Sequence, residues 1–222
     1  MLKYKAVLFD LDGTINDSGP GIMKSVQYAL GKMGYPPLPE ETLRRFVGPS
    51  LQYSFRTFSG MSGEEAERAV ALYRECYNNG EAYNLTVYDG MVQLLELLGE
   101  SGVRCAVVTS KPQVMAGKVL AHSGLLGYFA CVIGPDPKDG SNQKSVLIER
   151  ALRELGLESR DVLMVGDTMY DIIGAAEAGC DSVGVTYGYG TEEELHAHNA
   201  TYLADSAMEI GRIAGCGQEG TG

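Results

Sequence analysis

The sequence predicts an α/β protein in which a doubly wound parallel sheet forms the core and an all-helical domain is inserted after the first strand. Short apolar runs rich in Val, Ile and Leu show no polar alternation, which is typical of strands covered on both faces. From residue 90 onward these runs alternate with helical patterns, as in a doubly wound sheet. Residues 15–85 show helical patterns and no convincing strand, so they are the expected insertion.

The expected strands are short and bounded by polar residues or glycine. The first is "AVLF", which ends directly on a pair of acids. Each run is too short for a typical helix, and its Val and Ile content favours a strand. The five expected strands are residues 6–9, 104–109, 130–134, 161–166 and 182–186.

Helix start and stop signals mark the segments between the strands. An acidic residue or a proline opens several of them, and Gly closes them. In the core we expect helices at residues 89–102, 111–125, 142–157 and 169–180. In the insertion we expect them at residues 20–35, 39–48, 49–60 and 62–80.

These elements predict two domains and a tail. The core comprises residues 1–14 and 86–214, and the helical domain comprises residues 15–85. Residues 215–222 carry too little apolar surface to become ordered, so we expect a flexible tail there.

Composition narrows the class of partner. The 222 residues carry a formal net charge of -11, which argues against a nucleic acid polymer or an anionic membrane as the main partner. The five cysteines form no CxxC pair, which is typical of a reducing compartment. We find no signal peptide or membrane-spanning apolar run, and we expect a cytoplasmic soluble protein.

Reactive side chains follow the expected strands. Ligands of open parallel sheets bind beyond the carboxyl ends of the strands. The groups expected at that edge are Asp10 and Asp12, Thr109 and Ser110, Lys144, and Asp167 and Asp171.

These groups suggest metal-assisted phosphoryl chemistry. Several carboxylates at one place repel one another unless a cation lies among them, and oxygen ligands of this kind suit Mg²⁺. Asp10 could attack phosphorus and form an aspartyl-phosphate, while Asp12 could protonate the leaving alkoxide and later deprotonate water. Lys144 and the Thr109 hydroxyl would hold the phosphoryl oxygens.

Taken singly, each motif has a simpler interpretation. "DLDG" could be an acidic turn, "GDTMYD" could be a helix cap, and Thr109 with Ser110 could cap the following helix. Lys144 could be a solvated surface lysine. The ordered combination of all these groups at strand ends and helix starts favours an active site.

Four motifs in order resemble the haloacid dehalogenase superfamily of hydrolases, in the branch similar to phosphoglycolate phosphatases. They are "DLDGT" (10–14), "VVTSKP" (107–112), "GSNQKSVLIERAL" with Lys144, and "GDTMYDI" (166–172). The resemblance implies a Rossmann-like core with an inserted helical cap of the C1 type.

The resemblance also implies roles for single residues. Asp10 would be the nucleophile and Asp12 the acid and base. Mg²⁺ would be held by the Asp10 carboxylate, the Asp12 main-chain carbonyl and Asp167, with Asp171 in support. Thr109, and the backbone of Ser110, would contact phosphate beside Lys144.

The substrate is expected to be a small phosphomonoester, and the cap is expected to select it. Arg44 or Arg45, in "LRRFVGPSLQYSF" (43–55), could meet a substrate carboxylate or second phosphate, or could lie on a solvated helix face. A phosphoglycolate phosphatase-like activity is the first expectation. A 5′-nucleotidase, a pyrophosphatase, a β-phosphoglucomutase-like phosphomutase and a phospho-accepting or silent binding module remain alternatives. The chain could be a monomer or a homodimer.

Overall fold

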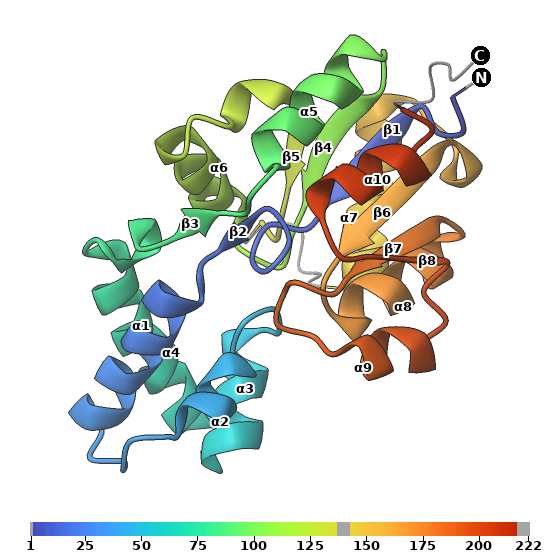
Figure 1. Ribbon diagram of the computed structural model, residues 1–222. Coiled ribbons are helices and arrows are strands. Elements are labelled where there is room, and N and C mark those ends of the chain that lie inside the picture. Colours follow the sequence, from blue (N-terminus) through green and yellow to red (C-terminus); the bar gives the residue numbers. More distant parts are fainter. Residues whose placement is uncertain (1, 137–142, 217–222) are drawn as a thin grey trace. The chain divides into compact units, whose positions relative to one another are not determined.

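The core is a parallel sheet, seen in a computed structural model that describes residues 2–136 and 143–216. Within these residues the sheet has six strands in the order β5-β4-β1-β6-β7-β8, all parallel to their neighbours. The predicted α/β fold class is therefore confirmed (Figure 1). The strands are β1 (Ala6–Phe9), β4 (Arg104–Val108), β5 (Phe129–Ile133), β6 (Val162–Gly166), β7 (Asp181–Val185) and β8 (Tyr202–Ala204).

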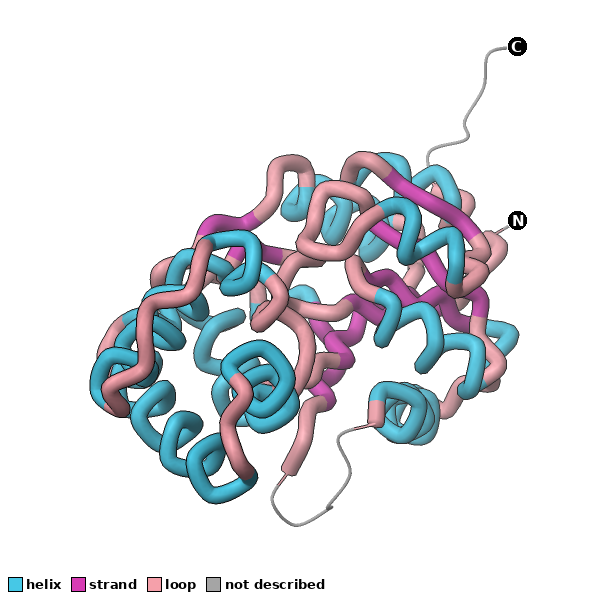
Figure 2. The backbone as a smooth tube through the Cα atoms, turned by 90° about the horizontal axis from the view of Figure 1, so that it is seen from below, coloured by secondary structure: helices cyan, strands magenta, loops and turns pink. Residues whose placement is uncertain are grey.

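The central strands are apolar because helices cover both faces of the sheet. On one face Ala6 and Leu8 of β1 pack in a cluster with Leu147 and Ile148, which belong to α7 (Lys144–Leu155). Val7 and Phe9 alternate with them and are also fully buried, so the second face is covered as well. Figure 2 shows helices on both sides of the strands.

Four core helices lie where the sequence predicted them, whereas α9 (Glu192–Ala197) and α10 (Ala207–Ile213) were not expected. Beside α7, α8 packs on the same face, and α5 packs with α10. Short 3₁₀ helices, η2 (Leu126–Tyr128) and η3 (Ser159–Asp161), precede β5 and β6. The remaining core helices are α5 (Met91–Glu100), α6 (Gln113–His122) and α8 (Met169–Ala178).

The inserted segment forms a second unit. By its internal contacts the described chain divides into Met1–Ile15 with Val87–Gly222, and Asn16–Thr86. Within the second unit α1 packs against α4, and Phe46 lies edge-on to Phe55 and Phe58. Its helices are α1 (Gly19–Lys32), α2 (Glu40–Arg44), α3 (Leu51–Ser59), α4 (Gly63–Asn78) and η1 (Glu81–Tyr83).

Three short strands were not expected from the sequence. β2 (Asn16–Asp17) and β3 (Thr86–Val87) pair as a two-stranded sheet, and each has two residues. The third is β8, a strand of three residues at the edge of the main sheet. Elements this short carry no periodic pattern, and only pairing with a neighbour defines them.

The C-terminal residues begin as part of the core. Gly215 and Cys216 lie in the segment expected to be a flexible tail, and Cys216 is buried and donates its backbone N–H to the Gly211 carbonyl oxygen. The rest of that expected tail, residues 217–222, lies outside the described residues.

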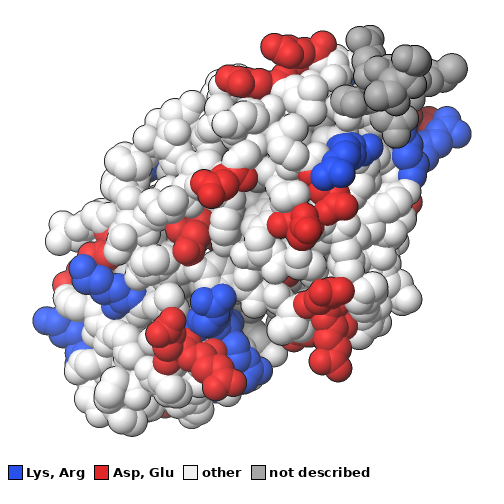
Figure 3. Space-filling model, viewed as in Figure 1, with Lys and Arg blue, Asp and Glu red and all other residues white. Residues whose placement is uncertain are grey.

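The surface carries charges of both signs. On the face drawn in Figure 3, acidic and basic side chains are interspersed. Among the helices that the structure describes, none combines the length and the apolar character needed to span a bilayer.

Candidate active site

The loop after β1 brings Asp10 to the carboxyl end of the sheet. The Asp10 backbone N–H donates to the Val165 carbonyl oxygen of β6 at 2.8 Å, which continues the strand pairing by one residue. Gly13 then turns the chain with a φ of +88°. A Cβ at Gly13 would lie 2.2 Å from Asp167 Oδ2. Glycine is therefore required here, both for the turn and for the close approach of Asp167.

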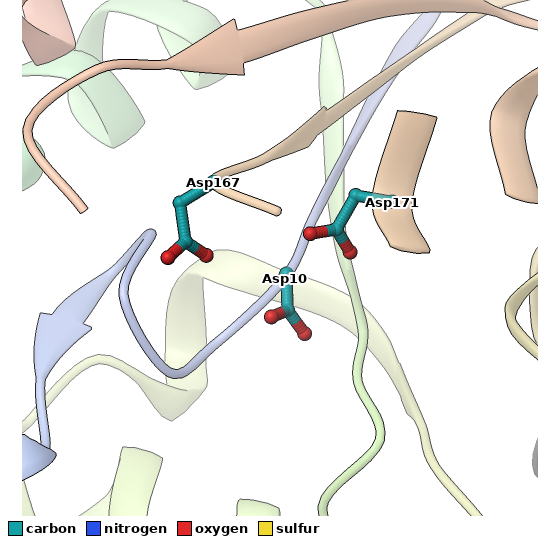
Figure 4. A group of neighbouring side chains, drawn as sticks. All are labelled: Asp10, Asp167 and Asp171. Carbon is teal, nitrogen blue, oxygen red and sulfur yellow. The ribbon is translucent and has the colours of Figure 1, made fainter. Parts of the chain in front are cut away.

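Three carboxylates from different elements meet at this edge. Asp10, Asp167 and Asp171 each offer an oxygen within 4.8 Å of the others, and all three are buried (Figure 4). Two donors hold Asp167 from the sides: Thr14 Oγ1 donates to Oδ1 at 3.1 Å, and the Tyr189 backbone N–H donates to Oδ2 at 2.8 Å. The sheet thus orders a cluster of acids that would otherwise repel one another.

The third acid is placed by a helix start. Thr168 is the N-cap of α8, and Asp171 accepts from its backbone N–H at 3.1 Å and from its hydroxyl at 2.9 Å, both through Oδ2. Oδ1 remains directed at the site. The "GDTMYD" motif is therefore both a helix cap and part of the cluster, so the two interpretations of this motif coexist.

Lys144 lies between two of the acids. Its Nζ is 3.0 Å from Asp10 Oδ1, 2.7 Å from Asp171 Oδ1 and 3.0 Å from the Val108 carbonyl oxygen. Burial alone would lower the pKa of Lys144, but the Asp10 and Asp171 carboxylates outweigh burial and raise it. Lys144 is a buried, charged side chain, so its interpretation as a solvated surface lysine is wrong.

Burial and mutual repulsion disfavour the charged forms of the acids. Burial, opposed by Lys144 and assisted by Asp171 and Asp12, raises the pKa of Asp10 to about 6. Burial also raises the pKa of Asp167 well above its usual range, and Asp171 and Asp10 add to the effect. The protein therefore maintains carboxylates in a place that disfavours their charge, which is typical of functional sites.

This donor set fits a hard divalent cation. Four buried or nearly buried carboxylates face two ammonium groups, which leaves a formal charge of −2 that one divalent ion would balance. Carboxylate oxygens gathered from three segments are the ligands that Mg²⁺ accepts. The three acids able to hold it together are Asp10, Asp167 and Asp171.

The Asp12 side chain pairs with a second lysine. Lys111 Nζ lies 2.8 Å from Asp12 Oδ1 and 2.7 Å from Oδ2. The expected metal role of Asp12 rests on its main-chain carbonyl, and its carboxylate is not one of the three acids that gather. We assigned no role to Lys111 from the sequence, so its pairing with Asp12 was missed.

The other residues expected to bind the substrate differ in their burial. Thr109 is buried at the end of β4, and its hydroxyl oxygen accepts the Lys111 backbone N–H at 3.2 Å, which leaves the hydroxyl proton for another acceptor. Ser110 beside it is half-buried. Arg45 is exposed in the helical unit, with its guanidinium carbon 4.3 Å from the centre of the Phe58 ring.

The structure also shows residues that support the site and that the sequence did not predict. Tyr187 donates its hydroxyl to the Thr14 carbonyl oxygen at 3.0 Å and packs against Tyr88. The nearby Tyr189 backbone donates to Asp167. Gly188 between the tyrosines approaches so closely that a Cβ there would lie 2.3 Å from the Asp167 side chain. A loop after β7 therefore completes the site, although "YGYG" carries no motif that predicts a site.

The strand-end acids, the lysine between them and the topology together define a class of hydrolase. The chain belongs to the haloacid dehalogenase-like hydrolase family, whose model matches residues 7–185. The family predicted from the four motifs is thus confirmed.

Similar proteins carry phosphatase and other names. A 5′-nucleotidase of Pseudomonas aeruginosa is 39% identical over 93% of this chain and 94% of its own length. A phosphoglycolate phosphatase of Vibrio parahaemolyticus is 31% identical over the same shares of the two chains. The tyrosine-protein kinase PtkA of Mycobacterium tuberculosis is 35% identical over 90% of this chain and 68% of its own length.

A solved structure shows the same fold. A predicted phosphatase from Clostridium acetobutylicum superposes with a TM-score of 0.90 and 38% identity, over 95% of this chain and 97% of that one. The fold is thus shared along nearly the whole chain.

Proposed function

We propose that this protein is a Mg²⁺-dependent phosphatase that hydrolyses a small phosphomonoester through an aspartyl-phosphate on Asp10. The observation that carries the proposal is the buried cluster in which Asp10 meets Asp167 and Asp171 and pairs with Lys144. A nucleophilic carboxylate beside a cation site and a fixed ammonium group is the arrangement that phosphoryl transfer needs.

Asp10, Asp167 and Asp171 would hold the ion, together with the Asp12 main-chain carbonyl. Bound there, Mg²⁺ would neutralise charge on the phosphoryl oxygens. Two of these acids have partners that keep them in place: Thr14 and the Tyr189 backbone donate to Asp167, and Thr168 donates to Asp171. The protein thus prepares the ligand geometry before any substrate arrives.

The chain's own residues perform the two chemical steps. An Asp10 carboxylate oxygen forms a bond to phosphorus while the bond from phosphorus to the leaving oxygen breaks, and Asp12 gives that oxygen its proton. Water then attacks the same phosphorus, Asp12 takes a proton from it, and the bond to Asp10 breaks. Lys144, the Thr109 hydroxyl and the Ser110 backbone hold the phosphoryl oxygens during both steps.

Relatives guide the choice of substrate class. The named activities of two relatives support either a phosphoglycolate-type ester or a nucleoside monophosphate. The nucleotide is a serious second candidate because the 5′-nucleotidase is 39% identical to this chain over 207 residues. Arg45 in the helical unit is proposed to meet a second anionic group of the substrate. A monomer or homodimer in the cytoplasm is proposed, in keeping with the acidic composition.

Phosphate release from a panel of esters tests this function. The panel contains phosphoglycolate, nucleoside monophosphates, pyrophosphate and a sugar phosphate, each with Mg²⁺ and with excess chelator. We expect Mg²⁺-dependent release that Asp10→Asn reduces by about 10³-fold or more. Asp205→Asn, a change at an exposed acid of the same unit, serves as the matched control and should behave as wild type.

Two results would contradict the proposal. One is a folded wild-type protein that binds Mg²⁺ and releases phosphate from no ester. The other is full activity in Asp10→Asn, which would remove Asp10 from the role of nucleophile. Conversion of a sugar phosphate to its isomer, without release of phosphate, would favour the phosphomutase.

A further inference from the structure

We propose that Lys111 is a positioning residue for Asp12, and that it sets the orientation in which the Asp12 carboxylate exchanges its proton with the leaving group. This inference rests on the proposed function, because it assigns a role within the same reaction. It concerns Lys111, the second ammonium group of the site, which pairs with the Asp12 carboxylate.

The contact between the two side chains is close and sheltered. Lys111 Nζ is within 2.8 Å of both Asp12 oxygens, and the two side chains are only 6% and 11% exposed. An ammonium group that meets both oxygens fixes the rotation of the carboxylate as well as its position. A surface ion pair, by contrast, leaves both side chains free to turn and contributes little.

The backbone of Lys111 is fixed on both sides. Its N–H donates to Thr109 Oγ1 at 3.2 Å, so the expected phosphate ligand and Lys111 share one turn after β4. The Lys111 carbonyl group packs closely against Gly134, where an added Cβ would lie 2.4 Å from the carbonyl oxygen. Pro112 follows, with its φ fixed by the ring. The Lys111 side chain therefore extends from a rigid turn.

The sheet explains why this turn reaches Asp12. β1 and β4 are hydrogen-bonded neighbours, with Phe9 in register with Val107. Asp12 lies just beyond the end of β1, and Lys111 lies just beyond the end of β4. Two loops from adjacent strands thus place the acid and its positioning cation side by side.

Asp12 alone has two opposite tasks in the proposed reaction. It must give a proton to the leaving oxygen and later accept one from water, and each transfer needs the same oxygen to face the reacting atoms. A misplacement of about 1 Å is enough to lose about 100-fold in rate. Lys111 prevents the carboxylate from turning away between the two transfers.

The leaving group offers a readout that a structural role would not move. An alkyl phosphate needs a proton on its leaving oxygen, whereas p-nitrophenyl phosphate leaves as a stable phenolate and needs little help. The value of kcat/KM reports the first step, in which this oxygen departs. Loss of Asp12 positioning must therefore reduce kcat/KM much more for the alkyl ester than for the aryl ester.

The experiment compares kcat and KM for both esters in wild type, Lys111→Met, Lys111→Arg and Lys118→Met. We expect Lys111→Met to lower kcat/KM by about 100-fold for the alkyl ester and by less than about 5-fold for the aryl ester. Lys111→Arg keeps the charge and the ability to meet two oxygens, and should recover part of the loss. Lys118→Met, on the exposed face of α6, is the matched control and should match wild type.

A second background tests whether Lys111 acts through Asp12. In Asp12→Asn the acid is already lost, so adding Lys111→Met should change kcat/KM by less than about 3-fold. Thermal unfolding of each variant separates loss of folding from loss of catalysis. If Lys111→Met proves unstable, Lys111→Arg measured on the two esters still decides the question.

Each contrary result has a distinct meaning. An equal loss for both esters, or wild-type activity in Lys111→Met, would overturn the positioning role while leaving the proposed phosphatase intact. A rise in KM confined to substrates that carry a carboxylate would assign Lys111 to substrate binding instead. A wild-type protein that hydrolyses neither ester would overturn both the proposed function and this inference.

Discussion

The two ends of the same sheet carry two polar clusters of very different character. At the carboxyl ends of the strands, Asp10, Asp171 and Lys144 are buried and closely paired. Before the amino ends, Lys3 meets Asp181 at 3.5 Å and contacts the Tyr202 hydroxyl, but the Lys3 and Asp181 side chains are 49% and 42% exposed. Water solvates the second cluster, whereas the first is shielded from it.

The burial of charged side chains distinguishes the functional end of the sheet from the other end. Exposed charges need no compensation, so the amino-end cluster can be explained by solvation and weak pairing alone. Buried acids that outnumber their cations destabilise the fold, and such a cost is typical of a working site.

Replacing one clustered acid should reduce activity while stabilising the metal-free protein. We expect Asp167→Asn to lower kcat by about 10³-fold, because a cation ligand contributes several kcal/mol to the transition state. The raised pKa of Asp167 shows that burial and nearby acids disfavour its charge, so a neutral amide should raise the melting temperature without Mg²⁺. Phosphate release and thermal unfolding check both parts. A lower melting temperature in the variant would show that the buried charge of Asp167 does not destabilise the metal-free protein.

Magnesium should stabilise the native protein through the same cluster. At a concentration of 100 times Kd, the ion adds about 2.7 kcal/mol to the free energy of unfolding. Chelator should remove this gain, and Asp167→Asn should abolish it. Thermal melts across a Mg²⁺ titration measure the effect. A similar gain in both proteins would place the ion elsewhere.

Removing the buried cation should cost stability. Lys144→Met leaves the Asp10 and Asp171 carboxylates without their ammonium partner. Breaking a buried pair in this way lowers the free energy of unfolding by about 3–5 kcal/mol. Denaturant unfolding of the metal-free protein measures it, and a loss below about 1 kcal/mol would show that water reaches the pair.

A methyl group added behind Lys144 should have an intermediate effect. A Cβ at Gly174 of α8 would lie 2.6 Å from Lys144 Cβ, so Gly174→Ala should lower the free energy of unfolding by about 1–3 kcal/mol. Gly117→Ala in α6 is the matched control, because nothing lies within 4 Å of its added Cβ. The control should be neutral or stabilising by up to about 1 kcal/mol. Denaturant unfolding of both variants checks the pair, and equal stability would refute tight packing at Lys144.

The amino-end cluster should tolerate change. Lys3→Met removes an exposed pair, and we expect the free energy of unfolding to fall by less than about 1 kcal/mol with no change in activity. Unfolding and phosphate release measured beside Lys144→Met complete the comparison. An equal loss in the two lysine variants would mean that burial does not separate the two ends.

Patterns within the sequence predicted most of the core. The five apolar runs became strands because a strand covered on both faces must be apolar along its whole length. β8 was missed because it has three residues at the edge and gains its identity only by pairing with β7. The acids at the ends of β1 and β6 could be anticipated because a parallel sheet brings all carboxyl ends to one edge.

From the amino-acid sequence alone one could predict five strands of the main sheet in their order, the family, and which acids, hydroxyls and lysine lie at strand ends and helix starts. These properties are local, since they depend on periodicity, turn residues and the direction of each strand. Only the tertiary structure decided that Lys144 joins Asp10 to Asp171, and that Lys111 holds Asp12. The pairings of Lys144 with Asp10 and of Lys111 with Asp12 join residues about a hundred or more positions apart. Strand order, and the burial that raises pKa values, exist only after the sheet has formed.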